Sequence, residues 1–128
     1  MILITGGAYH GKRNYAKQMY PGIDFVDGIS CVEETIFACQ GMDHFHSYIE
    51  NRMREGKKLP ELLKIVEKLK CENSEIVLIT DEIGYGIVPT DAFYREYRET
   101  HGRVCTQIAA EAKEVHRVIC GIGTVIKG

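Results

Sequence analysis

The first thirteen residues constrain the fold more than any other stretch of the sequence. An apolar run at 2–4 leads into a glycine-rich loop, in which Gly6, Gly11 and Lys12 have the spacing G-x-x-x-x-G-K. Between a buried strand and a helix, this spacing is typical of a loop that binds nucleotide phosphates. Backbone N–H groups at a helix N-terminus surround the anion with donors, and the lysine adds a positive charge. We therefore predict a phosphate-binding loop on an α/β scaffold.

The predicted nucleotide-binding residues are the whole loop and the two residues that open the helix: Gly6, Gly7, Ala8, Tyr9, His10, Gly11, Lys12 and Arg13. Lys12 is also a predicted catalytic residue. The position of Arg13 usually carries Ser or Thr, whose hydroxyl helps to hold Mg²⁺. Arginine has no acceptor oxygen and repels the cation, so the usual metal ligand of the loop is missing. The alternative is a glycine-rich turn without a ligand, in which Tyr9 and His10 fill the loop.

Carboxylates at the ends of two predicted strands are the candidates to replace that ligand. Asp27 follows a strand predicted over 23–26, and Asp81 and Glu82 follow one predicted over 75–80. Ligands of open parallel sheets bind at the carboxyl ends of the strands. We therefore predict all three carboxylates as Mg²⁺ ligands and Asp27 as a second catalytic residue. The alternatives are an Asp-Gly turn at Asp27 and a plain glycine-rich connection after Asp81.

Hydrophobic periodicity predicts an alternation of strands and helices in one domain over 1–128. We expect a three-layer α/β sandwich with a mostly parallel sheet and a terminal antiparallel strand. Asp43 is predicted to cap the second helix, Thr90 or Asp91 is predicted to cap the last, and a break is predicted at His101-Gly102. The predicted strands are 2–5, 23–26, 75–80, 115–120 and 123–126, and the predicted helices are 12–20, 44–55, 60–70 and 90–113, with a helical tendency over 29–40.

Composition and charge exclude several classes of function. The chain has 128 residues, 45% apolar and 27% charged, which is typical of a globular domain. Its formal net charge of −2 gives no electrostatic case for nucleic acid. We find neither a targeting segment nor an apolar run of the ~20 residues that span a bilayer. The five cysteines form no C-x-x-C pair and are predicted to be reduced. We therefore expect a cytoplasmic protein that binds no nucleic acid and no membrane.

Two histidines in the middle of the chain are expected to be surface residues. His44 and His46 lie two positions apart at the start of the predicted helix over 44–55. Residues two apart on a helix do not face each other. The alternative, a metal or catalytic pair, is the less favoured interpretation.

Three stretches together resemble one family of cobalamin biosynthesis. They are residues 2–12, the run Ile79-Thr80-Asp81-Glu82-Ile83-Gly84-Tyr85-Gly86-Ile87-Val88-Pro89, and Gly102-Arg103-Val104 with Gly121-Ile122-Gly123. The sequence resembles the adenosylcobinamide kinase / adenosylcobinamide-phosphate guanylyltransferase family. The specific element is E-[IV]-G-x-G-[IV]-V-P, because a phosphate-binding loop alone indicates only a nucleotide.

The resemblance implies a RecA-like P-loop fold, GTP or ATP as nucleotide, and a cytoplasmic homo-oligomer. Enzymes of that family phosphorylate the alcohol end of the corrinoid adenosylcobinamide. They then transfer GMP from GTP to the product through a guanylylated histidine. By position, Asp27 corresponds to the glutamate that the family has before a C-x-T-T segment, which reads Gly28-Ile29-Ser30-Cys31 here.

Departures from the family pattern limit the predicted activity. The second strand and the helix with the guanylylated histidine are missing between Tyr20 and Ile23, and Cys105-Thr106 replaces Asn-Gln. We therefore predict a kinase-type transferase that has lost guanylyl transfer. A second hypothesis is a non-catalytic nucleotide-binding or subunit-interaction relative, in which Arg13 replaces the charge of the metal and pairs with phosphate. A third is a scaffold that binds no nucleotide.

Overall fold

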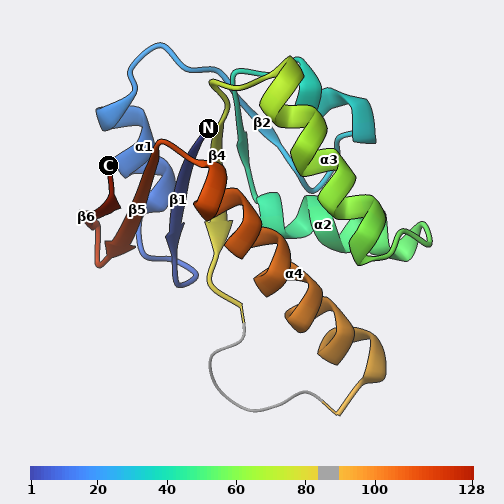
Figure 1. Ribbon diagram of the computed structural model, residues 1–128. Coiled ribbons are helices and arrows are strands. Elements are labelled where there is room, and N and C mark those ends of the chain that lie inside the picture. The colour runs from blue at the N-terminus through green and yellow to red at the C-terminus, as the bar shows by residue number, and fades with distance from the viewer. Residues whose placement is uncertain (84–89) are drawn as a thin grey trace.

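A six-stranded sheet organises the computed structural model, which describes residues 1–83 and 90–128 (Figure 1). Its strand order is β2-β3-β4-β1-β5-β6. The first five strands of this order are parallel, and β6 is antiparallel to β5. The prediction of a mostly parallel α/β sheet with a terminal antiparallel strand is thus confirmed. The strands are β1 (Ile2–Gly6), β2 (Phe25–Asp27), β3 (Gly41–Asp43), β4 (Val77–Asp81), β5 (Glu114–Ile119) and β6 (Ile122–Lys127).

Helices cover both faces of this sheet, as Figure 1 shows. Helix α1 lies against one face, and α2, α3 and α4 lie against the other. The described helices are α1 (Lys12–Met19), α2 (Phe45–Arg54), α3 (Leu59–Glu72) and α4 (Ala92–Glu111), with a 3₁₀ helix η1 (Glu33–Phe37) between β2 and β3. None of the described helices is long and apolar enough to cross a membrane.

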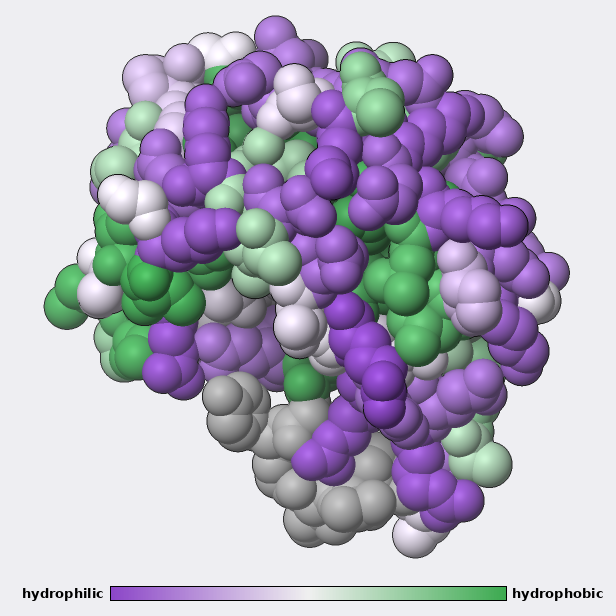
Figure 2. All heavy atoms as spheres, in the orientation of Figure 1, coloured by the Kyte–Doolittle hydropathy of each residue, from purple (hydrophilic) through white to green (hydrophobic). Residues whose placement is uncertain are grey.

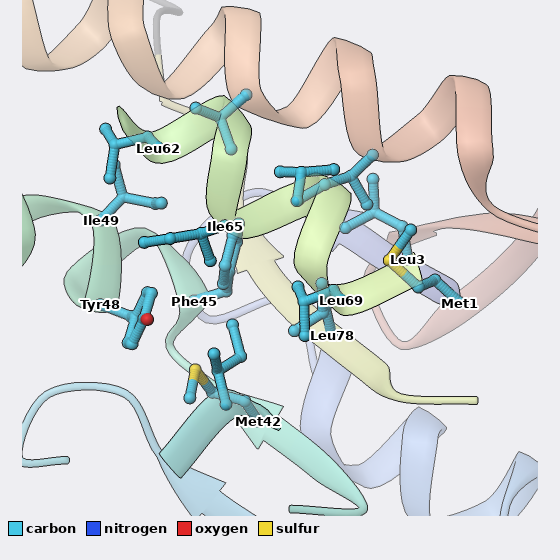
Figure 3. Packing of buried hydrophobic residues seen from close by; sticks show 14 of the residues in the cluster. Met1, Leu3, Met42, Phe45, Tyr48, Ile49, Leu62, Ile65, Leu69 and Leu78 are labelled. Atoms are coloured by element: carbon cyan, nitrogen blue, oxygen red, sulfur yellow. The ribbon is translucent and has the colours of Figure 1, made fainter. Parts of the chain in front are cut away.

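The central strands are buried on both faces, as continuous apolar strands of parallel sheets are. Leu3 and Leu78 point into the larger cluster with α2, α3 and α4 (Figure 3). Ile4 and Ile79 point to the opposite side, where Ala16 of α1 packs on them. The two-sided core fixes the register of β1 and β4, so that Gly6 and Asp81 lie side by side at the carboxyl edge.

Strand β3 is the main element that the sequence prediction missed. No strand was predicted over 41–43, but Gly41 pairs with Phe25 of β2 and with Val77 of β4. A Cβ atom at Gly41 would lie 2.6 Å from the Phe25 ring, so the glycine permits close packing within the sheet. Because β3 holds only three residues, its formation depends on pairing with distant segments, which local periodicity does not record.

Three further predictions differ from the structure. The segment 29–40 contains the 3₁₀ helix η1 and no α-helix. The break expected at His101-Gly102 is wrong, because α4 is one continuous helix over Ala92–Glu111. Asp43 ends β3, and the residue that caps α2 is His44.

The prediction for Asp91 is confirmed, since its side chain accepts hydrogen bonds from the backbone N–H groups of Phe93 and Tyr94. Gly84 and Gly86, the glycines of the connection after Asp81, lie outside the described residues.

An apolar surface lies at the β5–β6 edge of the sheet. Figure 2 shows hydrophobic side chains gathered over this edge. Its exposed members are Ile119, Ile122, Val125 and Ile126. Self-association through α2 and α3 has less support, because the apolar faces of these helices are buried in the core. The homo-oligomer stays a prediction, for which the β5–β6 edge is the better surface.

Candidate functional site

The glycine-rich loop joins β1 to α1 at the carboxyl edge of the sheet. Gly11 caps α1 in the left-handed region with φ 82°, which suits a residue without a Cβ atom. Gly6 lies against the backbone carbonyl of Val118, where a side chain would collide. The side chain of Tyr9 is fully exposed. The alternative in which Tyr9 fills the loop is therefore wrong for that residue.

Lys12 is buried beneath this loop, with only 7% of the residue exposed. Its Nζ atom donates a hydrogen bond to the Gly7 carbonyl oxygen at 2.8 Å and lies 2.7 Å from Asp81 Oδ1. Gly7 directly follows the central strand β1, and Asp81 is the last residue of the central strand β4. These two contacts therefore hold the ammonium group in one position. A cation fixed under a loop at a helix N-terminus forms an environment that binds anions such as phosphate.

A cavity of about 370 Å³ opens beside Lys12. One wall is the loop and the start of α1, over residues 8–13. The opposite wall comes from Ile29, from Asp43 and His44 at the end of β3, and from His46 and Ser47 of α2. Asp81 completes the lining. Of the predicted site residues, the structure therefore brings the loop from Ala8 to Arg13 and Asp81 into one cavity.

Asp43 is the acidic residue at this cavity that the sequence prediction did not assign to the site. Its Oδ1 atom accepts a hydrogen bond from the backbone N–H of His44 at 2.8 Å. Its Oδ2 atom lies 3.9 Å from Nε of Arg13, whose side chain is 57% exposed. The signal that could have identified Asp43 is the same as for Asp27: a short strand that ends in a carboxylate.

His46 holds the Asp81 carboxylate from the side opposite Lys12. Its Nδ1 atom accepts a hydrogen bond from the Asp81 backbone N–H at 3.1 Å, and its Nε2 atom lies 3.4 Å from Asp81 Oδ2. Burial lowers the pKa of His46, although the Asp81 charge opposes this shift. The neutral ring with its proton on Nε2 satisfies both contacts, so His46 fixes the orientation of Asp81.

His44 faces His46, which corrects the prediction that the two rings do not meet. The ring centroids are 5.8 Å apart. The physical reason is that His44 caps the helix in the left-handed region, with φ 53°, and so lies outside the helical geometry. Its Nδ1 atom lies 3.1 Å from Asp27 Oδ1. His44 and Asp27 therefore form a hydrogen-bonded pair whose imidazole lines the cavity.

The structure does not bring Asp27 and Glu82 to the cavity itself. Asp27 ends the edge strand β2, with β3 and β4 between it and the loop strand, and it reaches the cavity only through His44. Asp27 Oδ1 also accepts the backbone N–H of Ile29, as an Asx turn requires. Glu82 accepts hydrogen bonds from Arg117 Nε at 2.9 Å and Nη2 at 3.3 Å, beside a separate small cavity with Gly7 and His10.

The number of carboxylates at the cavity suits Mg²⁺ better than it suits a metal whose ligands all come from the protein. Among residues 1–83 and 90–128, no group of three or more His, Cys, Asp or Glu side chains is arranged to hold a metal. Mg²⁺ is usually bound by one or two carboxylates, substrate phosphates and water. Asp43 and Asp81, which line the same cavity, provide that number of carboxylates.

A buried lysine lies under a glycine-rich loop at the carboxyl edge of a parallel sheet, an arrangement typical of α/β proteins with a phosphate-binding loop. Residues 25–126 match the model of the family described as cobinamide kinase / cobinamide phosphate guanyltransferase. The chain belongs to this family, and the resemblance seen in the sequence is thus confirmed. The matched residues hold β2 to β5, most of β6 and the helices α2, α3 and α4, whereas β1, the loop and α1 precede them.

Two curated relatives match a shorter part of the chain. The bifunctional adenosylcobalamin biosynthesis protein CobU of Escherichia coli is 48% identical over 54 residues, which are 42% of this chain and 30% of that protein. Its counterpart of the same name from Salmonella typhimurium is 46% identical over 54 residues, with the same shares of the two chains. The matched segment therefore spans less than a third of the length of these relatives.

Proposed function

We propose that this protein is an adenosylcobinamide kinase–type transferase with a RecA-like P-loop fold. It binds ATP or GTP with Mg²⁺ in the cavity beside Lys12 and transfers the terminal phosphoryl group to the alcohol end of cobinamide. The observation that carries the proposal is the buried Lys12 ammonium beneath the loop, 2.7 Å from an Asp81 carboxylate that lines the same cavity as Asp43. The family match supports the choice of acceptor.

Phosphate binding rests on the loop and on two cations. The backbone N–H groups over residues 7–12 and the N-terminus of α1 provide donors for the phosphate oxygens. Lys12 offers its third N–H donor to the β and γ phosphates while it keeps its contacts with Gly7 and Asp81. The exposed Arg13 guanidinium at the cavity rim can pair with a phosphate in a bidentate manner.

Asp43 and Asp81 are the residues that would hold Mg²⁺. The ion, when bound, neutralises charge that develops on the transferred phosphoryl group. Asp43 takes the place proposed for Asp27 from the sequence, because it lines the cavity and Asp27 does not. The hydrogen bond from the His44 backbone and the contacts of His46 keep both carboxylates oriented without a loop hydroxyl.

His44 is the group we propose as general base. Its ring lines the cavity, and Nδ1 lies 3.1 Å from Asp27 Oδ1. With Nδ1–H donated to Asp27, the Nε2 atom is free to accept the proton of the substrate alcohol as the oxygen attacks phosphorus. Asp27 then acts as a positioning residue that stabilises the protonated imidazole. The sequence prediction of a catalytic role for Asp27 takes this indirect form.

Replacing His44 with glutamine should therefore lower kcat for phosphoryl transfer by about 10²-fold, the effect of removing a positioned base. The dissociation constant for nucleotide should change less than about threefold. Asp27→Asn should lower kcat in the same direction and shift the pH–rate profile, because the amide cannot stabilise a charged imidazole. Asp24→Asn, at an exposed position just before β2, is the matched control. A His44→Gln variant with full kcat would remove the base from the mechanism.

The assay for the proposed function uses the purified chain with ATP or GTP, Mg²⁺ and cobinamide. We expect cobinamide phosphate, identified by chromatography and mass, at a rate that depends on Lys12 and Asp43. We expect no covalent GMP adduct in the intact mass after incubation with GTP, because guanylyl transfer is predicted to be lost. Absence of cobinamide phosphate with both nucleotides would contradict the kinase proposal.

A non-catalytic relative is the second candidate function. It is favoured by Arg13, whose Nε lies 3.9 Å from Asp43 Oδ2 and whose charge occupies the side of the cavity where a metal would bind. In that case the nucleotide would bind equally well with Mg²⁺ and with a chelator. The kinase proposal expects weaker binding with the chelator, so the two candidates give opposite results.

A further inference from the structure

A second cavity, of about 410 Å³, lies farther along α2 from the site described above. Arg52 and Glu55 at the C-terminal end of α2 form one side, together with Lys57. The opposite side comes from Val32, Glu33 and Glu34 at the start of η1. Ser47 lines the first cavity and Arg52 the second, so about 7.5 Å of helix separates these two positions.

Arg52 is the most unusual residue of this second cavity. Only 4% of it is exposed, and its guanidinium lies 4.8 Å from the centre of the Tyr48 ring. Among the residues that the structure describes, the buried Nη1 atom has no hydrogen-bond partner. The Nε atom lies 2.8 Å from Glu55 Oε1 but without hydrogen-bond geometry. A buried donor without a partner is costly, and an acceptor oxygen of a ligand would satisfy it.

The charges at this cavity indicate which acceptor fits. Two cations, Arg52 and Lys57, face three carboxylates, Glu33, Glu34 and Glu55, so negative charge exceeds positive charge by one. Lys57 is already paired with Glu33 at 3.2 Å. A phosphate or carboxylate would be repelled by this excess. A neutral primary carboxamide fits, because its carbonyl oxygen accepts from Arg52 and its NH₂ group donates to a glutamate.

An exposed apolar strip connects the two cavities. Ile29 lines the first cavity and Val32 the second, and their side chains are 53% and 64% exposed. Both belong to the loop between β2 and η1, which Asn51 of α2 holds through a hydrogen bond from Nδ2 to the Ile29 carbonyl at 2.8 Å. A single large ligand with apolar edges and polar substituents can therefore extend from one cavity to the other.

We propose that the second cavity binds a peripheral carboxamide of the corrinoid acceptor, with Arg52 as the specificity-determining residue. This inference rests on the proposed function. The corrin macrocycle lies along Ile29 and Val32, its alcohol-bearing side chain enters the first cavity, and a carboxamide on the neighbouring edge reaches Arg52. The subsite makes acceptor binding, and not nucleotide binding, depend on the C-terminal end of α2.

Calorimetric titration of cobinamide into the intact chain tests this subsite, with a non-hydrolysable nucleotide present. The Arg52→Met variant should bind cobinamide about 10-fold more weakly or worse, because the loss of a hydrogen bond from a charged donor has effects of that size. Its nucleotide affinity should stay within about threefold of the original. Methionine keeps much of the buried volume, and replacing a buried charge by an apolar side chain is commonly tolerated. Arg54→Met, on the same helix and exposed, is the matched control.

A second variant makes the test independent of the buried arginine. Val32→Asn changes a residue that is 64% exposed and should also weaken cobinamide binding. Met19→Asn on α1, at a residue that is 47% exposed, should not. If the chain binds cobinamide and both Arg52→Met and Val32→Asn bind it equally well, the subsite is wrong and the proposed function stands. If the original chain binds nucleotide but no cobinamide, the subsite and the proposed acceptor are both overturned.

Discussion

Replacing Lys12 with alanine is expected to lower the rate of phosphoryl transfer by about 10³-fold. This is the upper end of the effects seen when an enzyme loses one preorganised donor to the charge that develops in the transition state. The ammonium group is buried, held by the Gly7 carbonyl and by Asp81, and lies beside the cavity that is proposed to bind the nucleotide. Its charge is therefore placed before the substrate arrives, and water cannot replace it at the same position. Nucleotide affinity should fall as well, because in the proposed mechanism Lys12 contacts the phosphates both before and during transfer.

The control for this experiment is Lys17→Ala, which removes an exposed lysine of the same helix. It should leave turnover within about twofold. Lys12→Arg should not restore activity, because the larger planar guanidinium cannot take the place of a compact ammonium group. Circular dichroism and an unfolding curve show whether the variant is folded, since removal of Lys12 leaves Asp81 without its closest cation. A folded Lys12→Ala variant with nearly full turnover would contradict the proposed role.

Acidification from pH 7 to pH 4 is expected to remove about 3 kcal/mol of the free energy of unfolding through His101 alone. This residue of α4 is 2% exposed, and its Nε2 atom lies 2.9 Å from Thr80 Oγ1. Burial, with a smaller contribution from His46, lowers the pKa of His101 to about 4. The unfolded chain therefore binds the proton first as the pH falls through the ordinary value of 6.5, and stability is lost from there down to about pH 4.

Urea unfolding curves between pH 4 and pH 7 test this expectation. The His101→Gln variant keeps a polar, neutral side chain near Thr80 and should lose most of the His101 contribution to the pH dependence. The difference between the two chains isolates His101 from other groups, such as His46, whose pKa is also lowered by burial. Glu99→Gln, on the exposed side of the same helix, is the control. Equal pH dependence of the original chain and His101→Gln would show that His101 does not titrate in this way.

The parts of the fold that could be predicted are those whose signal lies within a few consecutive residues. A strand was predicted over 75–80, which contains the unbroken apolar run Ile76–Ile79, and β4 covers most of that range. The spacing of Gly6, Gly11 and Lys12 predicted the loop between β1 and α1. Strand β3 could not be predicted in this way, since its three residues are held by β2 and β4 from distant parts of the chain.

The site was predicted in part for the same reason. Asp27 and Asp43 each end a short strand, and only the strand order decides which one reaches the cavity. His44 was interpreted as helical, although it adopts a left-handed conformation before the helix and turns toward Asp27. The burial of Arg52 results from packing against Tyr48 and from the position of η1. None of these relationships is local in the sequence.

The most direct test of the central claim is calorimetric titration of ATP and GTP into the chain, each with Mg²⁺ and again with EDTA. We predict binding of at least one nucleotide with Mg²⁺, weakened about 10-fold or more by EDTA and severely weakened in Lys12→Ala. Equal binding with and without Mg²⁺ would favour the non-catalytic relative, with Arg13 in place of the metal. Absence of binding by both nucleotides under both conditions would contradict the assignment of the cavity beside Lys12 as a nucleotide site.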